Sequence, residues 1–172
     1  MSLMVELQPS LGPALVVGGG TVAARKVRGL LDAGFDVTVV SPELDEGFAE
    51  LDGYRWWKRS YIDGDPLGFG LVMACTHDRE VNRRVGEACR AARQPVLVAD
   101  AQSESTFYTP AVHRDGELSV AIGTGGASPK LARQLRDQVA NALGEGWDER
   151  IKQERAMREA RLGRGGSEDF CR

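Results

Sequence analysis

The residues with the clearest chemical use in this sequence form two glycine-rich turns, at 18–20 and 123–126. Each turn follows an apolar, strand-like run and leads into a helix-like segment. A turn of this kind presents backbone N–H groups at the start of a helix, where the helix dipole favours a bound anion. Both turns are therefore candidate sites for phosphate or carboxylate groups.

The first turn fits the pattern G-x-G-x-x-A, with Gly18, Gly20 and Ala23 at its fixed positions. The first glycine allows a tight turn, the second lets the backbone approach a pyrophosphate, and the small sixth residue packs helix on strand. This context predicts a dinucleotide site in which Gly18, Gly20, Thr21 and Val22 contact the cofactor. A tight turn with only a packing role is the alternative.

A dinucleotide site also needs an acidic side chain after the second strand, to bind ribose hydroxyls. Glu43 follows an apolar run and the pair Ser41-Pro42, so Pro42 and Glu43 are the expected contacts. No arginine adjoins Glu43 to accept a 2′-phosphate, which favours NAD over NADP. A solvated glutamate at a helix start is the alternative. Thr76, at the end of a later strand, is expected beside the ribose or nicotinamide.

The elements that must position these residues alternate between strand and helix. Helical periodicity predicts helices at 22–33, with Val22 on its inner face, and at 79–93, with a short helix within 43–53. Apolar runs predict strands at 14–17, 37–40, 54–58, 71–75 and 95–99. This alternation is typical of an α/β protein with a Rossmann-type, doubly wound parallel sheet.

The pattern changes after this sheet. Residues 101–109 are polar and loop-like, and an alternating run at 117–122 predicts a strand with one exposed face. A helix is expected at 128–143 and a charged helix at 148–161, before a tail at 163–172 that we expect to fray.

The composition excludes several classes of function. The 172 residues carry 22 Lys and Arg against 25 Asp and Glu, a net charge of −3, which argues against a dedicated nucleic-acid-binding protein. No apolar stretch reaches the roughly 20 residues of a membrane span, and no leader begins the chain. We therefore expect a cytoplasmic protein without membrane or nucleic-acid partners.

The cysteines and histidines predict no metal site. Cys75, Cys89 and Cys171 are odd in number and lack metal-ligand spacing, which fits a reducing compartment. His113 is isolated, and we expect it on a surface turn rather than at a metal ion.

Four segments together resemble one protein family. They are V-V-G-G-G-T-V-A-A-R-K-V at 16–27, L-V-M-A-C-T-H-D-R-E-V-N at 71–82, V-L-V-A-D-A at 96–101 and I-G-T-G-G-A-S-P-K-L-A-R at 122–133. In order and spacing they resemble precorrin-2 dehydrogenase, the NAD-dependent module of siroheme synthase. The block T-G-G-x-S-P-x-L-A-R is the most specific, because an ordinary Rossmann enzyme does not carry it. The sequence departs from the family near Leu97, where an asparagine is usual, and at Asp100-Ala101-Gln102, where D-x-P is usual.

The resemblance implies that NAD oxidises precorrin-2 to sirohydrochlorin, and some members also insert Fe²⁺ to give siroheme. It implies a Rossmann domain at 1–110, a small α+β dimerisation domain at 111–146 and a helical C-terminal segment at 147–172, assembled as a homodimer. The strand at 117–122 and the helix after it also make a poor independent core, which agrees with burial against a second subunit.

The oxidation removes a hydride, which NAD can accept, and a proton, which a carboxylate or water can accept. Asp100 ends a predicted strand and matches the aspartate that the family is thought to use as general base or in metal insertion. An aspartate that caps the next turn is the alternative. His77 and Asp78 are weaker candidates for handling the proton. Iron is expected only as a substrate, held by the tetrapyrrole nitrogens.

The second glycine turn is the expected site for the carboxylates of precorrin-2. The expected substrate contacts are hydrogen-bond donors or cations, namely Thr124, Gly125, Ser128, Arg133, Arg136 and Lys26. An N-cap at Ser128, followed by a proline at the first helical position, is the alternative. Two other functions remain open, a non-catalytic NAD-sensing Rossmann module and another small Rossmann oxidoreductase.

Overall fold

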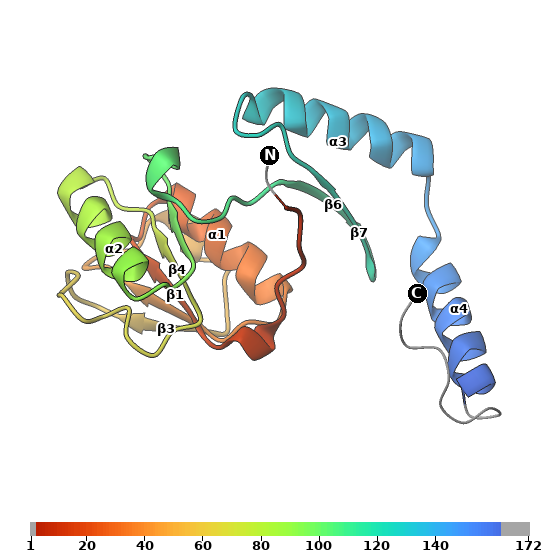
Figure 1. Ribbon diagram of the computed structural model, residues 1–172, viewed down its shortest axis with the longest axis horizontal. Helices are drawn as coiled ribbons and strands as arrows, with labels where there is room; N and C mark the ends of the chain where they lie inside the picture. The colour runs from red at the N-terminus through yellow and green to blue at the C-terminus, as the bar shows by residue number, and fades with distance from the viewer. Residues whose placement is uncertain (1–2, 163–172) are drawn as a thin grey trace. The chain divides into compact units, whose positions relative to one another are not determined.

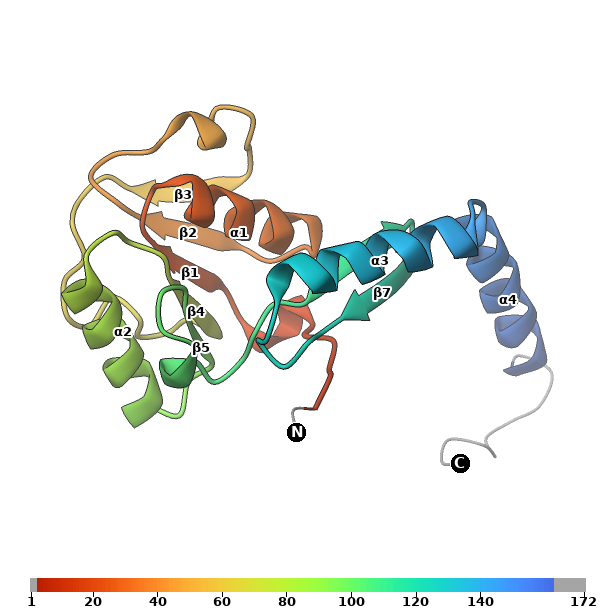
Figure 2. The same ribbon diagram turned by 90° about the horizontal axis from the view of Figure 1, so that it is seen from above.

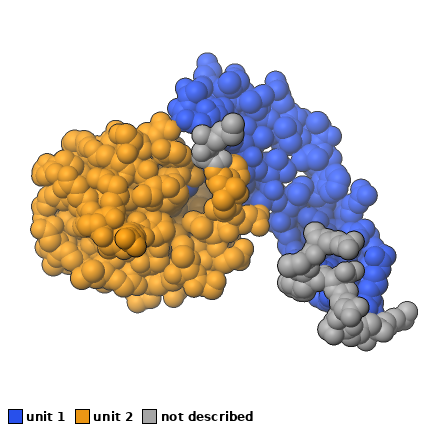
Figure 3. Space-filling view, viewed as in Figure 1, with its two compact units in different colours: residues 1–2, 109–172 blue, residues 3–108 orange. Residues whose placement is uncertain are grey.

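The structure is a computed structural model that describes residues 3–162 (Figure 1). It divides the chain into two compact units, with the boundary between Tyr108 and Thr109 (Figure 3). In chain order, we call residues 3–108, orange in Figure 3, the first unit and residues 109–162, blue in Figure 3, the second unit. The tail that we expected to fray, at 163–172, lies outside the described residues, and so does Cys171. Within the described part, no helix has the length and apolar character of a membrane span.

The first unit is built on a five-stranded parallel sheet in the order β3-β2-β1-β4-β5, which can be followed in Figure 2. Its strands are β1 (Ala14–Val17), β2 (Val37–Val40), β3 (Tyr54–Trp57), β4 (Leu71–Ala74) and β5 (Val96–Val98). The central strand β1 pairs with β2 on one side and with β4 on the other, so Val17 lies opposite both Val40 and Ala74. The predicted α/β class, parallel sheet and strands are confirmed.

The inner strands are buried on both faces because the sheet is covered on both sides. Val16, Val39 and Met73 belong to one core cluster, which includes Ala23 and Val27 of α1 (Thr21–Asp32). The alternate residues of the same strands belong to a second cluster, which includes Val85 and Cys89 of α2 (Arg79–Ala91). The continuous apolar runs are those expected of parallel strands between two helical layers.

Short 3₁₀ segments complete the first unit: η1 (Pro9–Leu11), η2 (Glu46–Phe48) and η3 (Gln102–Glu104). The short helix expected within 43–53 is therefore a single 3₁₀ turn, and the loop expected at 101–109 contains another. Val22 was expected on the inner face of its helix, and this was wrong, because its side chain is 41% exposed.

The second unit contains an antiparallel hairpin of β6 (Ala111–Asp115) and β7 (Leu118–Ile122), followed by α3 (Pro129–Leu143) and α4 (Trp147–Leu162). Strand β6 was not predicted. His113 lies within it, opposite Val120, so its expected place on a surface turn was wrong. Among the described residues of this unit, Ala132 alone is buried. The unit thus has little core of its own.

Candidate functional site

The first glycine turn lies where three neighbouring strands end. Gly18 follows β1, and its N–H donates to the carbonyl oxygen of Val40 at 2.9 Å. Cys75 follows β4, and its N–H donates to the carbonyl oxygen of Val17 at 2.7 Å. The turn follows the last residue of β1, so it lies at the carboxyl edge of the sheet. The chain runs from β1 outward to β2 and β3 on one side and then to β4 and β5 on the other, so the strand order reverses at this point. Open α/β sheets bind their ligands at such a point.

The first two glycines of this turn let neighbouring backbone segments pack closely against it. Gly18 has φ +123°, and a Cβ there would lie 2.5 Å from the carbonyl oxygen of Cys75. At Gly19 a Cβ would collide with the carbonyl oxygen of Glu43. Gly20 is the N-cap of α1 and offers no side-chain cap, so backbone N–H groups of the first turn keep capacity for a bound anion.

Two further residues predicted to contact the cofactor open α1. The hydroxyl of Thr21 donates a hydrogen bond of 2.7 Å to Oδ2 of Asp45. Val22, the second residue of α1, is exposed, so packing in the core does not explain an apolar side chain at this position. An exposed apolar side chain beside the turn is available to a cofactor.

The loop after β2 brings a different carboxylate to the turn than the sequence predicts. Pro42 and Glu43 are both exposed, and it is the main-chain oxygen of Glu43 that is engaged, by the Ser41 hydroxyl at 2.6 Å. Asp45 donates its own N–H to the carbonyl oxygen of Gly19 at 2.8 Å. The ribose contacts of Pro42 and Glu43 stay a prediction, whereas Asp45 was missed.

Asp45 is held as a carboxylate by its hydrogen bonds. The Gly47 amide donates to Oδ1 at 2.7 Å, and the Thr21 hydroxyl donates to Oδ2. These bonds, the amide of Thr21 and the charge of nearby His77 lower the pKa of Asp45, against a smaller opposing effect of desolvation. The available signal was its N-cap position ahead of the short helix, which aspartate favours.

The side chain of Asn82 in α2 binds the turn after β4. This residue was not identified from the sequence. Asn82 is fully buried in α2. Its Oδ1 accepts from the N–H of Thr76 at 3.0 Å and from the Thr76 hydroxyl at 2.8 Å, and its Nδ2 donates to the Thr76 carbonyl at 3.0 Å. An asparagine on the inner face of an amphipathic helix was the signal.

The two neighbours of Thr76 have separate roles. His77 lies over the glycine turn, and its Nε2 is 3.2 Å from where a Cβ of Gly20 would stand. Asp78 caps α2 by accepting from the amides of Glu80 and Val81 at 2.8 and 3.2 Å. The structure therefore gives Asp78 a capping role, and His77 a place beside the turn.

Asp100 follows β5 with its carboxylate partly exposed. Its Oδ2 lies 3.9 Å from Nε of Arg79, whose guanidinium also pairs with Glu104. Burial raises the pKa of the Cys75 thiol to about 11, opposed by Lys26 and Arg25 and increased by Asp100. The charges of Asp100 and Lys26 therefore both affect the Cys75 thiol, which follows the end of β4.

Lys26 lies on α1 and is half-buried. Burial lowers the pKa of its ammonium, Cys75 raises it and Arg25 lowers it. A lysine with a lowered pKa gives up its proton more readily than an exposed one.

The other predicted substrate contacts belong to the second unit. The Oγ of Ser128 accepts from the Leu131 amide at 3.1 Å, so Ser128 is the N-cap of α3. The Thr124 hydroxyl bonds the amide of Ser128 at 3.2 Å, and Gly125 lies exposed in the same turn. On α3 itself, Arg133 is exposed, and the guanidinium of Arg136 contacts Asp137 at 2.6 Å.

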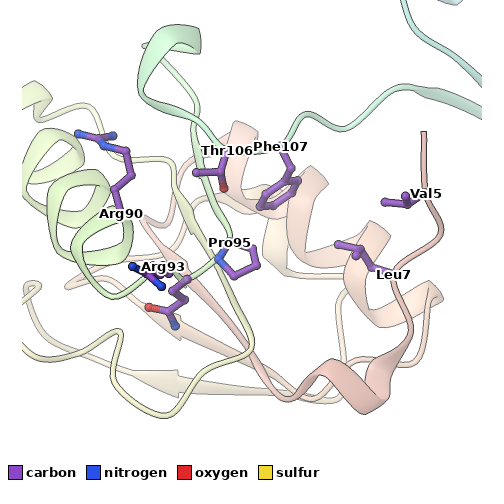
Figure 4. Close-up of a pocket in the computed structure, with 8 residues that line it drawn as sticks. Val5, Leu7, Arg90, Arg93, Pro95, Thr106 and Phe107 are labelled. Carbon is purple, nitrogen blue, oxygen red and sulfur yellow. The ribbon is translucent and has the colours of Figure 1, made fainter. Parts of the chain in front are cut away.

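A separate pocket of about 390 Å³ lies in the first unit at the amino end of β5 (Figure 4). Its lining includes Leu7, Pro95 and Phe107, and no residue predicted for the site lines it. Within residues 3–162, no group of three His, Cys, Asp or Glu side chains is placed to hold a metal ion.

Known proteins resemble this chain along most of its length. It is 43% identical over 134 residues to siroheme synthase 3 of Aeromonas hydrophila, which covers 76% of this chain and 29% of that protein. It is 41% identical to siroheme synthase of Methylococcus capsulatus, with 76% and 28% covered. The chain thus spans less than a third of these curated relatives.

A solved structure, "SirC, precorrin-2 dehydrogenase", matches with a TM-score of 0.78 and 26% identity, over 98% of this chain and 83% of that chain. The family description "Sirohaem biosynthesis protein central" matches residues 115–142, and "Putative NAD(P)-binding" matches residues 5–111. The resemblance predicted from the sequence is confirmed. The chain therefore belongs to the family described as "Putative NAD(P)-binding", and the segment that matches the sirohaem biosynthesis family follows directly after that match.

Proposed function

We propose that this protein uses NAD to oxidise precorrin-2 to sirohydrochlorin in siroheme biosynthesis. One observation carries the proposal: the chain combines an NAD(P)-binding fold with a sirohaem biosynthesis segment, and its structure matches a precorrin-2 dehydrogenase over 98% of its length. A Rossmann unit alone would support only nucleotide binding, since unrelated functions share that fold.

The carboxyl edge of the first unit fits a dinucleotide. The glycine turn stands at the end of β1, and Gly20 leaves the α1 N-terminus without a side-chain cap, which suits a pyrophosphate. We assign the pyrophosphate to Gly18, Gly20, Thr21 and Val22. Pro42 and Glu43 would then take the adenine ribose and Thr76 the nicotinamide side, and Glu43 would disfavour a 2′-phosphate. NAD, when bound, accepts the hydride.

Asp100 is the residue that we assign to the proton. It stands at a strand end on the same edge of the sheet, and its carboxylate is partly exposed. The guanidinium of Arg79, at 3.9 Å and itself paired with Glu104, places a positive charge near this carboxylate. In this role Asp100 takes the proton that leaves precorrin-2 as the hydride departs.

The substrate carries several carboxylates, so its contacts should be donors and cations. We assign them to the α3 start, with Thr124, Gly125 and Ser128, together with Arg133 and Arg136. Lys26, on α1, is the remaining residue that we assign to a substrate carboxylate. The hydroxyl of Ser128 already caps α3, which leaves its remaining capacity as an acceptor or donor for the substrate.

We also propose a homodimer, with the Rossmann domain at 1–110, the dimerisation domain at 111–146 and the helical segment at 147–172. Support comes from the second unit, in which Ala132 is the one buried residue described, while Leu131 and Leu135 of α3 are 46% and 38% exposed. An apolar helix face of this kind is stabilised when a second subunit covers it.

A cytoplasmic location is consistent with the cysteines of the described chain, because Cys75 and Cys89 are buried thiols without a disulfide. If the protein also inserts iron, Fe²⁺ enters as a substrate bound by the tetrapyrrole nitrogens.

The decisive experiment is anaerobic incubation of the protein with precorrin-2 and NAD⁺, followed by absorption spectra. We expect the spectrum of sirohydrochlorin to appear together with NADH. NAD⁺ binding without turnover would indicate a regulatory module instead. Asp100→Asn should lower the rate by roughly 10²–10⁴-fold while NAD⁺ affinity is kept, because a general base typically contributes this factor. Unchanged oxidation by this variant would refute the assignment of the proton to Asp100, and unchanged iron insertion as well would refute any catalytic role.

A further inference from the structure

The α1 N-terminus, to which we assign the pyrophosphate, already has an anion of the protein beside it. The carboxylate of Asp45 accepts the Thr21 hydroxyl at 2.7 Å through Oδ2. Thr21 is the first residue of α1, and Gly20 before it supplies no cap. A carboxylate at a helix N-terminus interacts with the same positive end of the dipole that a phosphate uses.

The backbone keeps this carboxylate in place. The N–H of Asp45 donates to the carbonyl oxygen of Gly19 at 2.8 Å, within the glycine turn itself. The amide of Gly47 binds its other oxygen at 2.7 Å. The first bond therefore fixes the loop against the turn, and the second, within the loop, holds the carboxylate so that its other oxygen meets Thr21.

We infer that Asp45 sets the affinity of this site for the dinucleotide, by competing with the pyrophosphate for the start of α1. This inference rests on the dinucleotide binding proposed above. Like charges at short range repel, so a bound pyrophosphate must either tolerate Asp45 or displace it from Thr21. In both cases the carboxylate weakens binding and keeps the cofactor exchangeable.

Two other roles for Asp45 predict different effects on dinucleotide binding. If its carboxylate binds the adenine ribose, as an acidic residue after the second strand often does, it must strengthen binding. If it only caps η2 through Gly47, its charge must leave binding unchanged. Asp45→Asn separates the three roles, because asparagine keeps the cap and the shape but removes the charge.

The experiment measures the binding of NAD⁺, inorganic pyrophosphate and adenosine to the full chain by calorimetry. Where the heat of adenosine binding is small, adenosine is measured by its competition with NAD⁺. Asp45→Asn should bind NAD⁺ about three- to tenfold more tightly, as expected for removing one anion from a helix N-terminus that binds another. Pyrophosphate should gain by a similar factor, and adenosine, which has no phosphate, should not change.

Glu46→Gln is the matched control, because it removes the same charge one residue away, where no role in binding is assigned. Equal gains in both variants would overturn the inference in favour of a general effect of net charge. Weaker binding of NAD⁺ and adenosine in Asp45→Asn would overturn it in favour of a ribose contact, and unchanged binding in favour of a cap alone. Asp45→Ser, another good N-cap, repeats the test if the first variant is unstable.

The two proposals fail in different ways. Wild-type protein that binds NAD⁺ but does not oxidise precorrin-2 would refute the proposed reaction and leave the role of Asp45 intact. If the wild type binds no NAD⁺, the pyrophosphate measurement alone decides, and an unchanged pyrophosphate affinity in Asp45→Asn overturns the inference.

Discussion

Asn82→Ala tests whether the turn after β4 depends on a single buried side chain. The Asn82 amide makes three hydrogen bonds of 2.8–3.0 Å to Thr76 and is fully buried. Alanine removes all three bonds to the half-buried Thr76, and each hydrogen bond contributes about 0.5–1.5 kcal/mol net. We therefore expect the free energy of unfolding to fall by about 2–4 kcal/mol in total. For a chain of this length that lowers Tm by roughly 5–15 °C.

The assay is thermal unfolding followed by circular dichroism, together with NAD⁺ binding at a temperature where both proteins are folded. NAD⁺ affinity should also fall, because Thr76 and His77 lose the support that places them beside the glycine turn. Asn141→Ala is the control, since Asn141 is exposed on α3. A loss of stability below about 1 kcal/mol, with unchanged NAD⁺ affinity, would refute the reasoning, because each bond lost should cost about that much.

Three further predictions concern specificity, assembly and acid stability. The wild type should show a higher kcat/KM with NAD⁺ than with NADP⁺, and Glu43→Gln should bring the two values closer together. Equal kcat/KM values in the wild type would contradict the repulsion of a 2′-phosphate by Glu43. Light scattering at micromolar concentration should give a dimer, and Leu135→Glu should give a monomer. Asp65→Asn should lower the free energy of unfolding at pH 7 by about 1–3 kcal/mol, with a smaller difference below about pH 4 in urea titrations. Burial raises the pKa of Asp65, but bonds from Arg59 (2.7 Å) and the Ile62 amide (3.0 Å) outweigh it and lower that pKa, so its stabilisation is complete at neutral pH and lost on acidification.

The parallel sheet could be predicted because its strands are buried on both faces. The runs of β1 and β4 are continuously apolar, and only a two-sided covering explains such a pattern. Strand β6 could not be found in the same way, because A-V-H-R-D is half polar and lies in a unit with little core. The two turn residues are Gly116 and Glu117, and a glycine at the first of them, here with φ +55°, was the available signal of a hairpin.

The glycine turn could also be predicted, because its spacing reflects a local backbone requirement. Asp45 and Asn82 were missed for a different reason. Their roles depend on which backbone groups the folded loops bring to them, namely Gly19 and Thr76, and no spacing in the sequence records such a pairing. Glu43 was chosen by its distance along the chain, but the path of the loop engages its main chain at the turn and leaves its side chain exposed.

The distribution of these residues over the two units makes cofactor binding and turnover separable. Every residue assigned to the dinucleotide lies within Leu3–Tyr108, a unit with its own buried core on both faces of the sheet. The proposed substrate contacts Thr124, Ser128 and Arg133 lie in the other unit, where Ala132 alone is buried among the described residues. Loss of the dimer should therefore impair oxidation of precorrin-2 far more than binding of NAD⁺. A monomeric variant that lost both activities together would show instead that the dinucleotide site itself needs the partner subunit.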